Sequence, residues 1–161
     1  MSEIKFSPDV LFEVSWEVCN KVGGIHTVLA TKALTVTKQL GDKYITIGPD
    51  FSQDGEISEF VEDSTLMKTW RQTLYNDGIR VRIGRWNVCG NPIAILIDFT
   101  TLFASKDDVL RELWEDYKVD SISGQWDYVE PVLFGYLAGK VIDSYVDNFC
   151  TSVDKVVAHF H

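Results

Sequence analysis

The sequence contains few cysteines: Cys19, Cys89 and Cys150 are the only three among 161 residues. An odd number at wide spacing excludes a framework of paired disulfides, and it lacks the close ligand pairs of a structural zinc site. Free thiols of this kind are typical of proteins in a reducing compartment, so we expect a cytoplasmic location.

Long apolar runs and excess positive charge are also missing. No stretch approaches the ~18 apolar residues of a membrane span, and MSEIKFSPDV at the N-terminus has no apolar core, so we expect no secretory signal. The 15 lysines and arginines face 24 aspartates and glutamates, which gives a formal net charge of −9. This charge opposes nucleic acid and anionic membrane as partners. Any anionic ligand would need local compensation.

The chain does contain enough apolar material for a core, 45% of its residues. Apolar runs predict strands at 10–16, 44–49, 79–88, 92–99 and 155–160, and helical spacing predicts helices at 25–40, 64–78, 108–119 and 130–149. The acidic segment 50–63 predicts an exposed loop or an edge hairpin. Because strands and helices alternate, we predict an α/β fold with a largely parallel sheet.

Three details of the helices follow from residue types. Ser64 is a candidate N-cap of the second helix. Pro131 suits the first turn of the last helix. Gly135 and Gly139, four residues apart, predict close packing of that helix onto the sheet.

The segment NKVGGIHTVLATKA, residues 20–33, joins a predicted strand to a predicted helix. In an open α/β sheet this loop lies at the carboxyl edge, where ligands bind. A helix start offers unpaired N–H groups, Gly23 and Gly24 leave them accessible, and Lys21 adds a positive charge. These residues therefore suit a diphosphate, but the spacing is not that of a P-loop or dinucleotide fingerprint. On spacing alone, a tight glycine turn beside a solvated lysine is the better explanation of the pattern.

LFEVSWEVCNKVGGIHTVLATKA resembles the N-terminal segment of glycogen synthases of the animal and fungal type. Further matching pieces follow in the same order: GRW at 84–86, ELW at 112–114, VLFGYL at 132–137 and VVAHFH at 156–161. KVGGI and VVAHFH are the most specific of these motifs. The resemblance covers essentially the whole chain.

This resemblance implies a Rossmann-like sheet that forms part of the N-terminal domain of a GT-B glycosyltransferase, with residues 1–161 an incomplete domain. It implies retaining transfer of glucose from UDP-glucose to the non-reducing end of an α-1,4-glucan, without metal or cofactor, in a homo-oligomeric enzyme. Lys21, Gly23 and Gly24 would line the donor side of the cleft, and His161 would lie beside the transferred glucose as the catalytic residue. UDP-glucose is favoured over ADP-glucose only by the likeness of KVGGI to the animal and fungal branch.

Other polar residues receive structural roles. His159 is expected to face the opposite side of its strand from His161, and no role is expected for His26. Glu13 is expected to make a buried hydrogen bond, whereas Glu17 would orient Lys21 or acceptor hydroxyls. Arg85 is expected to stabilise a strand end rather than bind an anion. The cysteines are expected to be small core residues.

The chain ends at His161, where a crossover helix is expected. We therefore expect a fragment that is inactive alone, because relatives hold the nucleotide mainly in a second domain. Two alternatives stay open: a non-catalytic module that binds glucan or protein, and a small independent nucleotide-binding protein. Continuation of the reading frame with Glu-Trp would oppose the first, and tight UDP binding by these residues alone would support the second.

Overall fold

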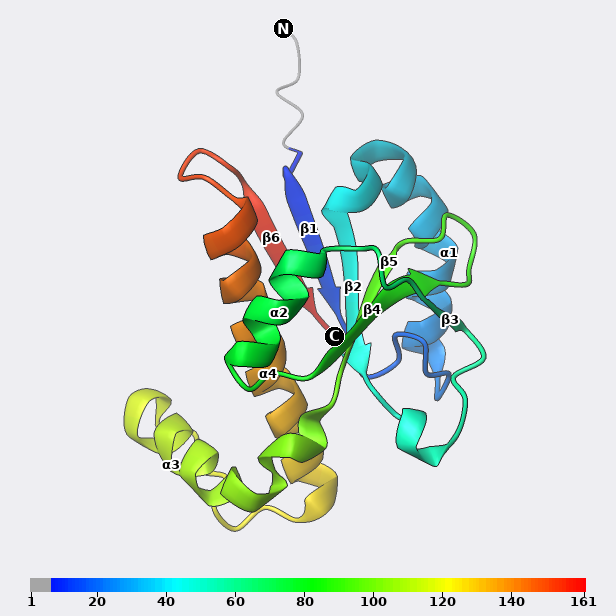
Figure 1. Cartoon of the computed structure of the whole chain (residues 1–161). Helices are drawn as coiled ribbons and strands as arrows, with labels where there is room; N and C mark the ends of the chain where they lie inside the picture. The colour runs from blue at the N-terminus through cyan, green and yellow to red at the C-terminus, as the bar shows by residue number, and fades with distance from the viewer. Residues whose placement is uncertain (1–6) are drawn as a thin grey trace, which may run out of the picture.

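The computed structural model describes residues 7–161 and contains one six-stranded sheet with the order β3-β4-β5-β2-β1-β6 (Figure 1). The four strands β5, β2, β1 and β6 are parallel, whereas β4 is antiparallel to β5 and β3 to β4. The prediction of an α/β fold with a mostly parallel sheet is confirmed. The strands are β1 (Val10–Val14), β2 (Tyr44–Pro49), β3 (Phe60–Glu62), β4 (Val81–Trp86), β5 (Ile93–Ile97) and β6 (Val156–Phe160).

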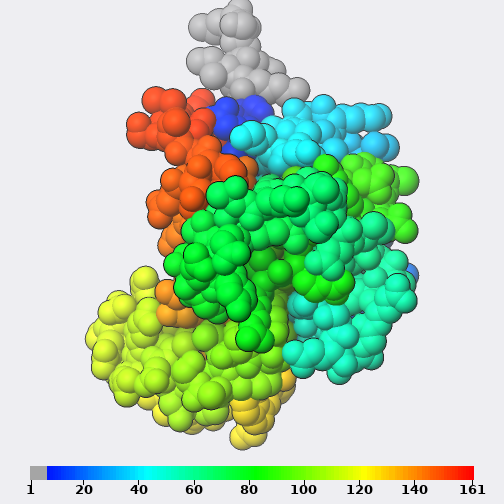
Figure 2. Space-filling model, in the orientation of Figure 1, coloured from blue at the N-terminus to red at the C-terminus, as the bar shows by residue number. Residues whose placement is uncertain are grey.

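Within residues 7–161 there are four α-helices: α1 (Gly24–Leu40), α2 (Lys68–Asn76), α3 (Lys106–Tyr117) and α4 (Trp126–Phe149). Helices α1, α2 and α4 cover the faces of the sheet, and α3 packs on α4. Helix α1 covers one face, and α2 and α4 pack against the other (Figure 1). In the space-filling view, α2 and its neighbouring chain hide the middle of the sheet, and α3 projects at the lower left (Figure 2).

The alternation of side chains along β1 explains why the two faces differ. Val10, Phe12 and Val14 belong to the larger apolar core under α2 and α4, where Phe12 meets Tyr145 edge to face at 5.1 Å. Glu13 lies between them in the sequence and therefore points to the α1 face. The second, smaller core includes Leu29, Trp86 and Leu96 on that α1 face. The strand that carries a charged residue into the interior is thus anchored by the apolar residues on either side of it.

The acidic segment 50–63 does not form the hairpin that was one of its two predicted alternatives: it is mainly exposed loop, as the other alternative required, and ends in the edge strand β3. It contains a 3-10 turn at Ser52–Asp54 and then β3, which pairs with β4 rather than with the segment itself. Gly84 of β4 permits this pairing, because a Cβ there would lie 2.1 Å from the backbone oxygen of Val61.

Three details of the predicted helices are wrong. Helix α2 begins at Lys68, after Met67 in the left-handed conformation (φ 51°), so Ser64 is not its N-cap. Helix α4 begins at Trp126, so Pro131 lies inside it rather than in its first turn. A Cβ at Gly135 or Gly139 would meet no atom within 4 Å, so neither glycine marks a close approach of α4 to the sheet.

Within residues 7–161, no helix combines the length and apolar character needed to cross a membrane. The part of the N-terminal sequence at residues 1–6, used above to argue against a secretory signal, lies outside the described residues.

Candidate functional site

The carboxyl edge of the parallel strands brings the two main predicted site segments together. The loop that carries Lys21 follows β1, and β6 pairs with β1 in the same direction and ends at Phe160. The backbone N–H of His161 donates to the carbonyl of Val14, 2.9 Å away. Lys21, Gly23, Gly24 and His161 therefore lie at one edge of the sheet, where open α/β sheets bind ligands. What they bind stays a prediction.

The two glycines of the loop are not required by the chain itself. Neither Gly23 nor Gly24 has a positive φ; a Cβ at Gly24 would meet no atom within 4 Å, and one at Gly23 would lie 3.4 Å from Oε1 of Glu17, an ordinary contact. A tight turn or close internal packing would have left one of these signs. The amides of Gly24 and Ile25 also have no acceptor among residues 7–161. The geometry thus favours the ligand interpretation of the glycines over the turn interpretation.

Glu17 occupies part of the helix start that the sequence assigned to a ligand. Its Oε2 accepts hydrogen bonds from the backbone N–H of Gly23 at 2.7 Å and of His26 at 3.1 Å. Helix α1 has no acidic residue in its first turn, so this carboxylate satisfies the orphan donors from the preceding loop. Glu17 was predicted to orient Lys21 or acceptor hydroxyls, and its role at the start of α1 was not predicted. The available signal was an acid shortly before a helix whose own N-cap is glycine.

The backbone hydrogen bond from Gly23, with a smaller contribution from His26, lowers the pKa of Glu17 below its usual value. A lowered folded-state pKa means that the Glu17 contact is fully formed above the unfolded-state pKa and is lost as the pH falls through the lower folded value. We expect the protection of the Gly23 and His26 amides, measured by NMR as exchange relative to the intrinsic rate at each pH, to fall across that acidic window. In Glu17→Gln the exchange should lose this acid-dependent step; an unchanged profile would show that Glu17 does not cap α1.

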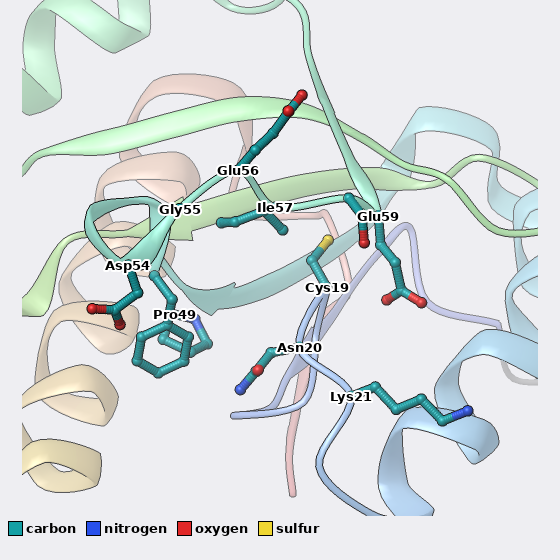
Figure 3. Close-up of a pocket in the computed structure, with 11 residues that line it drawn as sticks. Cys19, Asn20, Lys21, Pro49, Asp54, Gly55, Glu56, Ile57 and Glu59 are labelled. Atoms are coloured by element: carbon teal, nitrogen blue, oxygen red, sulfur yellow. The ribbon is translucent and has the colours of Figure 1, made fainter.

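Lys21 lies at the rim of a cavity of about 430 Å³ beside the loop (Figure 3). Its side chain is exposed and has no hydrogen-bonding or ionic partner among the described residues. Within the described residues, the same cavity is lined by three acids, Asp54, Glu56 and Glu59, together with polar and apolar groups. Asp54 and Glu59 lie on opposite sides of it, and the carboxylate of Glu56 points away (Figure 3). With two carboxylates, Asp54 and Glu59, at its sides and one lysine at its rim, the cavity suits sugar hydroxyls better than a bare phosphate.

The wall of this cavity is held by a partly buried polar contact that was not predicted from the sequence. Glu59 accepts a hydrogen bond from the indole N–H of Trp86 at 3.3 Å and lies 2.8 Å from Nε2 of His26. The His26 and Trp86 rings meet nearly perpendicular, with centroids 5.6 Å apart. His26 therefore has a structural role: it fastens α1 to β4 and fixes Glu59 at the cavity.

His161 and His159 lie on the same side of β6, contrary to the sequence prediction. Side chains alternate along a strand, so residues two apart share a face, and the expectation of opposite sides was wrong. The two imidazole rings are 4.1 Å apart. Nε2 of His161 is 2.6 Å from Oε2 of Glu13, and Nδ1 of His159 is 3.8 Å from the same oxygen.

These three side chains form a group that could hold a divalent cation, since one ligand atom from each lies within 4.8 Å of the others. The absence of a metal from the reaction thus stays a prediction. Glu13 is also paired, through its other oxygen, with the ammonium group of Lys32 on α1. The predicted buried hydrogen bond of Glu13 is confirmed.

Two further predictions have different outcomes. Arg85 makes a two-pronged pair with Asp42, at 2.6 and 3.2 Å, and the Arg85 guanidinium lowers the pKa of that carboxyl. Its structural interpretation is confirmed. Of the cysteines, Cys19 is buried and burial raises the pKa of its thiol, but Cys89 is exposed. The expectation that all three are core residues is therefore wrong for Cys89.

Comparison with known proteins gives one consistent result. The family model described as glycogen synthase matches residues 13–161. The chain is similar to the glycogen [starch] synthase of Neurospora crassa (34% identical over 155 residues) and to that of Caenorhabditis elegans (32% over 155 residues). It is 30% identical over 163 residues to the liver glycogen [starch] synthase of Homo sapiens. These alignments cover 94%, 94% and 100% of this chain but only 22%, 23% and 23% of the relatives.

Proposed function

The chain belongs to the glycogen synthase family, and from this premise we propose that it forms part of the substrate cleft of an enzyme that adds glucose to glycogen. The donor is UDP-glucose, the acceptor is the non-reducing end of an α-1,4-glucan, and the configuration is retained. The observation that supports this proposal most is that Lys21, Gly24 and His161 all lie at the carboxyl edge of the parallel strands. Residues 1–161 would then be part of the N-terminal domain of a two-domain GT-B enzyme.

On the donor side, Lys21 offsets the negative charge that develops on the leaving UDP. Its ammonium group has no partner among the described residues, so it is not already neutralised within the chain. Charge placed in advance where charge develops is the interaction that lowers a barrier most. The free amides of Gly24 and Ile25 add donors at the positive end of α1. Glu17 already fills the neighbouring donor positions, so the donor approaches at Gly24 rather than at Gly23.

On the acceptor side, the acid-lined cavity beside Lys21 receives glucan hydroxyls. Asp54 and Glu59 accept hydrogen bonds from hydroxyl groups, and the apolar residues Pro49, Phe51 and Ile57 offer surface to the C–H face of a sugar ring. His161, directly after β6, holds the glucose of the donor in position for transfer to the glucan end. The reaction would need no metal or cofactor, and the enzyme would act in the cytoplasm, as an oligomer, without nucleic acid or membrane.

A transfer assay on the product of the complete reading frame tests this function. Labelled glucose should pass from UDP-glucose to glycogen, and less well from ADP-glucose. The 161-residue chain alone should be inactive. If the complete product, folded and mixed with glycogen, incorporates no glucose from either donor, the proposal fails and a glucan-binding module becomes the better interpretation.

A further inference from the structure

Glu13 is the charged residue that β1 carries into the interior. It is 2% exposed and lies between the core residues Phe12 and Val14. A buried carboxylate is retained at low cost only if both of its oxygens are paired. Here each oxygen has a different partner: Oε1 meets the ammonium group of Lys32, and Oε2 meets Nε2 of His161 at 2.6 Å.

The sheet register sets this arrangement. Glu13 lies directly opposite His159 in the pairing of β1 with β6, and His161 follows two residues later on the same face. The backbone of His161 is itself tied to Val14. The ring of His159 lies 4.1 Å from that of His161. His161 is therefore held by three contacts: its backbone N–H donates to Val14, its Nε2 meets Glu13, and its ring packs beside the ring of His159.

We propose that Glu13, held in place by Lys32, is a positioning residue that fixes the proton of His161 on Nε2 and so presents the Nδ1 lone pair to the substrate. A carboxylate can only accept, so the nitrogen that faces it must carry the hydrogen. A neutral imidazole has one N–H, which leaves Nδ1 as an acceptor. Nδ1 has no hydrogen-bonding partner among residues 7–161. This inference rests on the proposed function, because it takes His161 as the side chain beside the transferred sugar.

The tautomer has a consequence for what His161 can bind. A lone pair on Nδ1 accepts from a sugar hydroxyl but repels a phosphate oxygen, which has no hydrogen to donate. His161 would therefore select the glucose part of the donor, while Lys21 and the start of α1 serve the diphosphate. The glucose and the diphosphate of the donor would thus be bound by different groups at the carboxyl edge.

The wild-type chain tests the tautomer directly. With ¹⁵N-labelled histidine, a chelator present to remove bound metal, and a pH about two units above the usual imidazole pKa of ~6.5, long-range ¹H–¹⁵N spectra distinguish the two nitrogens. The chain has only three histidines, His26, His159 and His161, which single variants assign. We expect His161 as the Nε2–H form with a proton signal protected from water. A His161 protonated on Nδ1, or one with a rapidly exchanging Nε2 proton, overturns the proposal without any variant.

Glu13→Gln gives the second test, with His26 as an internal reference. Lys32 should hold the single oxygen of the glutamine, so the amide NH₂ faces His161 and favours the opposite, Nδ1–H tautomer. His26, which is paired with Glu59 instead, should not change. A His161 that stays in the Nε2–H form in a folded Glu13→Gln chain contradicts the role of Glu13.

Activity separates this inference from the function on which it rests. In the complete enzyme, Glu13→Gln should lower kcat by about tenfold or more, because the sugar loses its placed acceptor. Full transfer by Glu13→Gln overturns the positioning role and leaves the proposed function intact. A wild-type enzyme without transfer overturns the function, whereas the tautomer is measured without substrate.

Discussion

Replacing Lys21 by alanine in the complete enzyme should lower kcat for glucose transfer by a factor on the order of 100, with little change in stability. The lysine is exposed and has no partner within the described chain, so the fold does not depend on it. Under the proposed function, its loss would remove one placed charge from beside the leaving diphosphate. Transfer rates from UDP-glucose, measured beside a thermal melt, check both parts of this expectation.

Lys38→Ala is the matched control. Like Lys21, Lys38 is an exposed lysine. It lies in the last turn of α1, away from the carboxyl edge. It should keep wild-type kcat. If Lys21→Ala and Lys38→Ala behave alike, Lys21 is a solvated lysine next to a loop and the donor-side role is lost.

Replacing Gly48 by alanine should damage both stability and activity. Gly48 lies in β2, and a Cβ there would be 2.6 Å from the backbone oxygen of Val18 and 2.8 Å from its Cβ. Val18 is fully buried and leads into the Lys21 loop, so the added methyl group must displace that loop. Overpacking of this kind costs about 1–3 kcal/mol of unfolding free energy. A shift of the loop by roughly 1 Å should also lower transfer by up to about 100-fold.

Gly135→Ala is the control for this substitution, because it is the same chemical change at an open site. Gly135 lies inside α4, where a Cβ meets nothing within 4 Å. Alanine there should raise the unfolding free energy by about 0.5–1 kcal/mol through its helix preference. Urea unfolding of both variants measures the difference. A Gly48→Ala protein as stable as Gly135→Ala would show that Val18 moves aside freely and that the contact does not support the loop.

The elements best predicted from sequence are those that end at a glycine or a proline, because these residues restrict which backbone conformation can follow. Strand β2 begins at Tyr44 and ends at Pro49, as predicted, and α1 ends before Gly41, whose φ is 57°. The start of α2 was missed because it depends on Met67 adopting a left-handed conformation, which methionine rarely signals. The start of α4 was placed too late because proline suits a first turn but is tolerated inside a helix when tertiary packing outweighs its cost.

The candidate site was predictable only where one segment carries it. KVGGI and His161 could be found because both lie in motifs that resemble those of the family; the spacing of the lysine and the glycines alone did not distinguish a ligand site from a tight turn. The contacts of Glu13 join β1 to α1 and to a residue 148 positions away along the chain. The pairing of His26 with Glu59 likewise depends on the return of β3 to the sheet. Such partners are set by strand order and register, which one sequence does not specify.

The central claim is that the carboxyl edge of β1 and β6 holds the sugar nucleotide, and amide hydrogen exchange on the complete enzyme tests it most directly. Exchange should be followed with and without UDP-glucose. We predict that the ligand slows exchange at Gly24 and Ile25, whose amides have no acceptor among residues 7–161, and in 158–161, while α3 is unchanged. Slowed exchange confined to other parts of the enzyme, with 20–26 and 158–161 unaffected under saturating UDP-glucose, would contradict the claim.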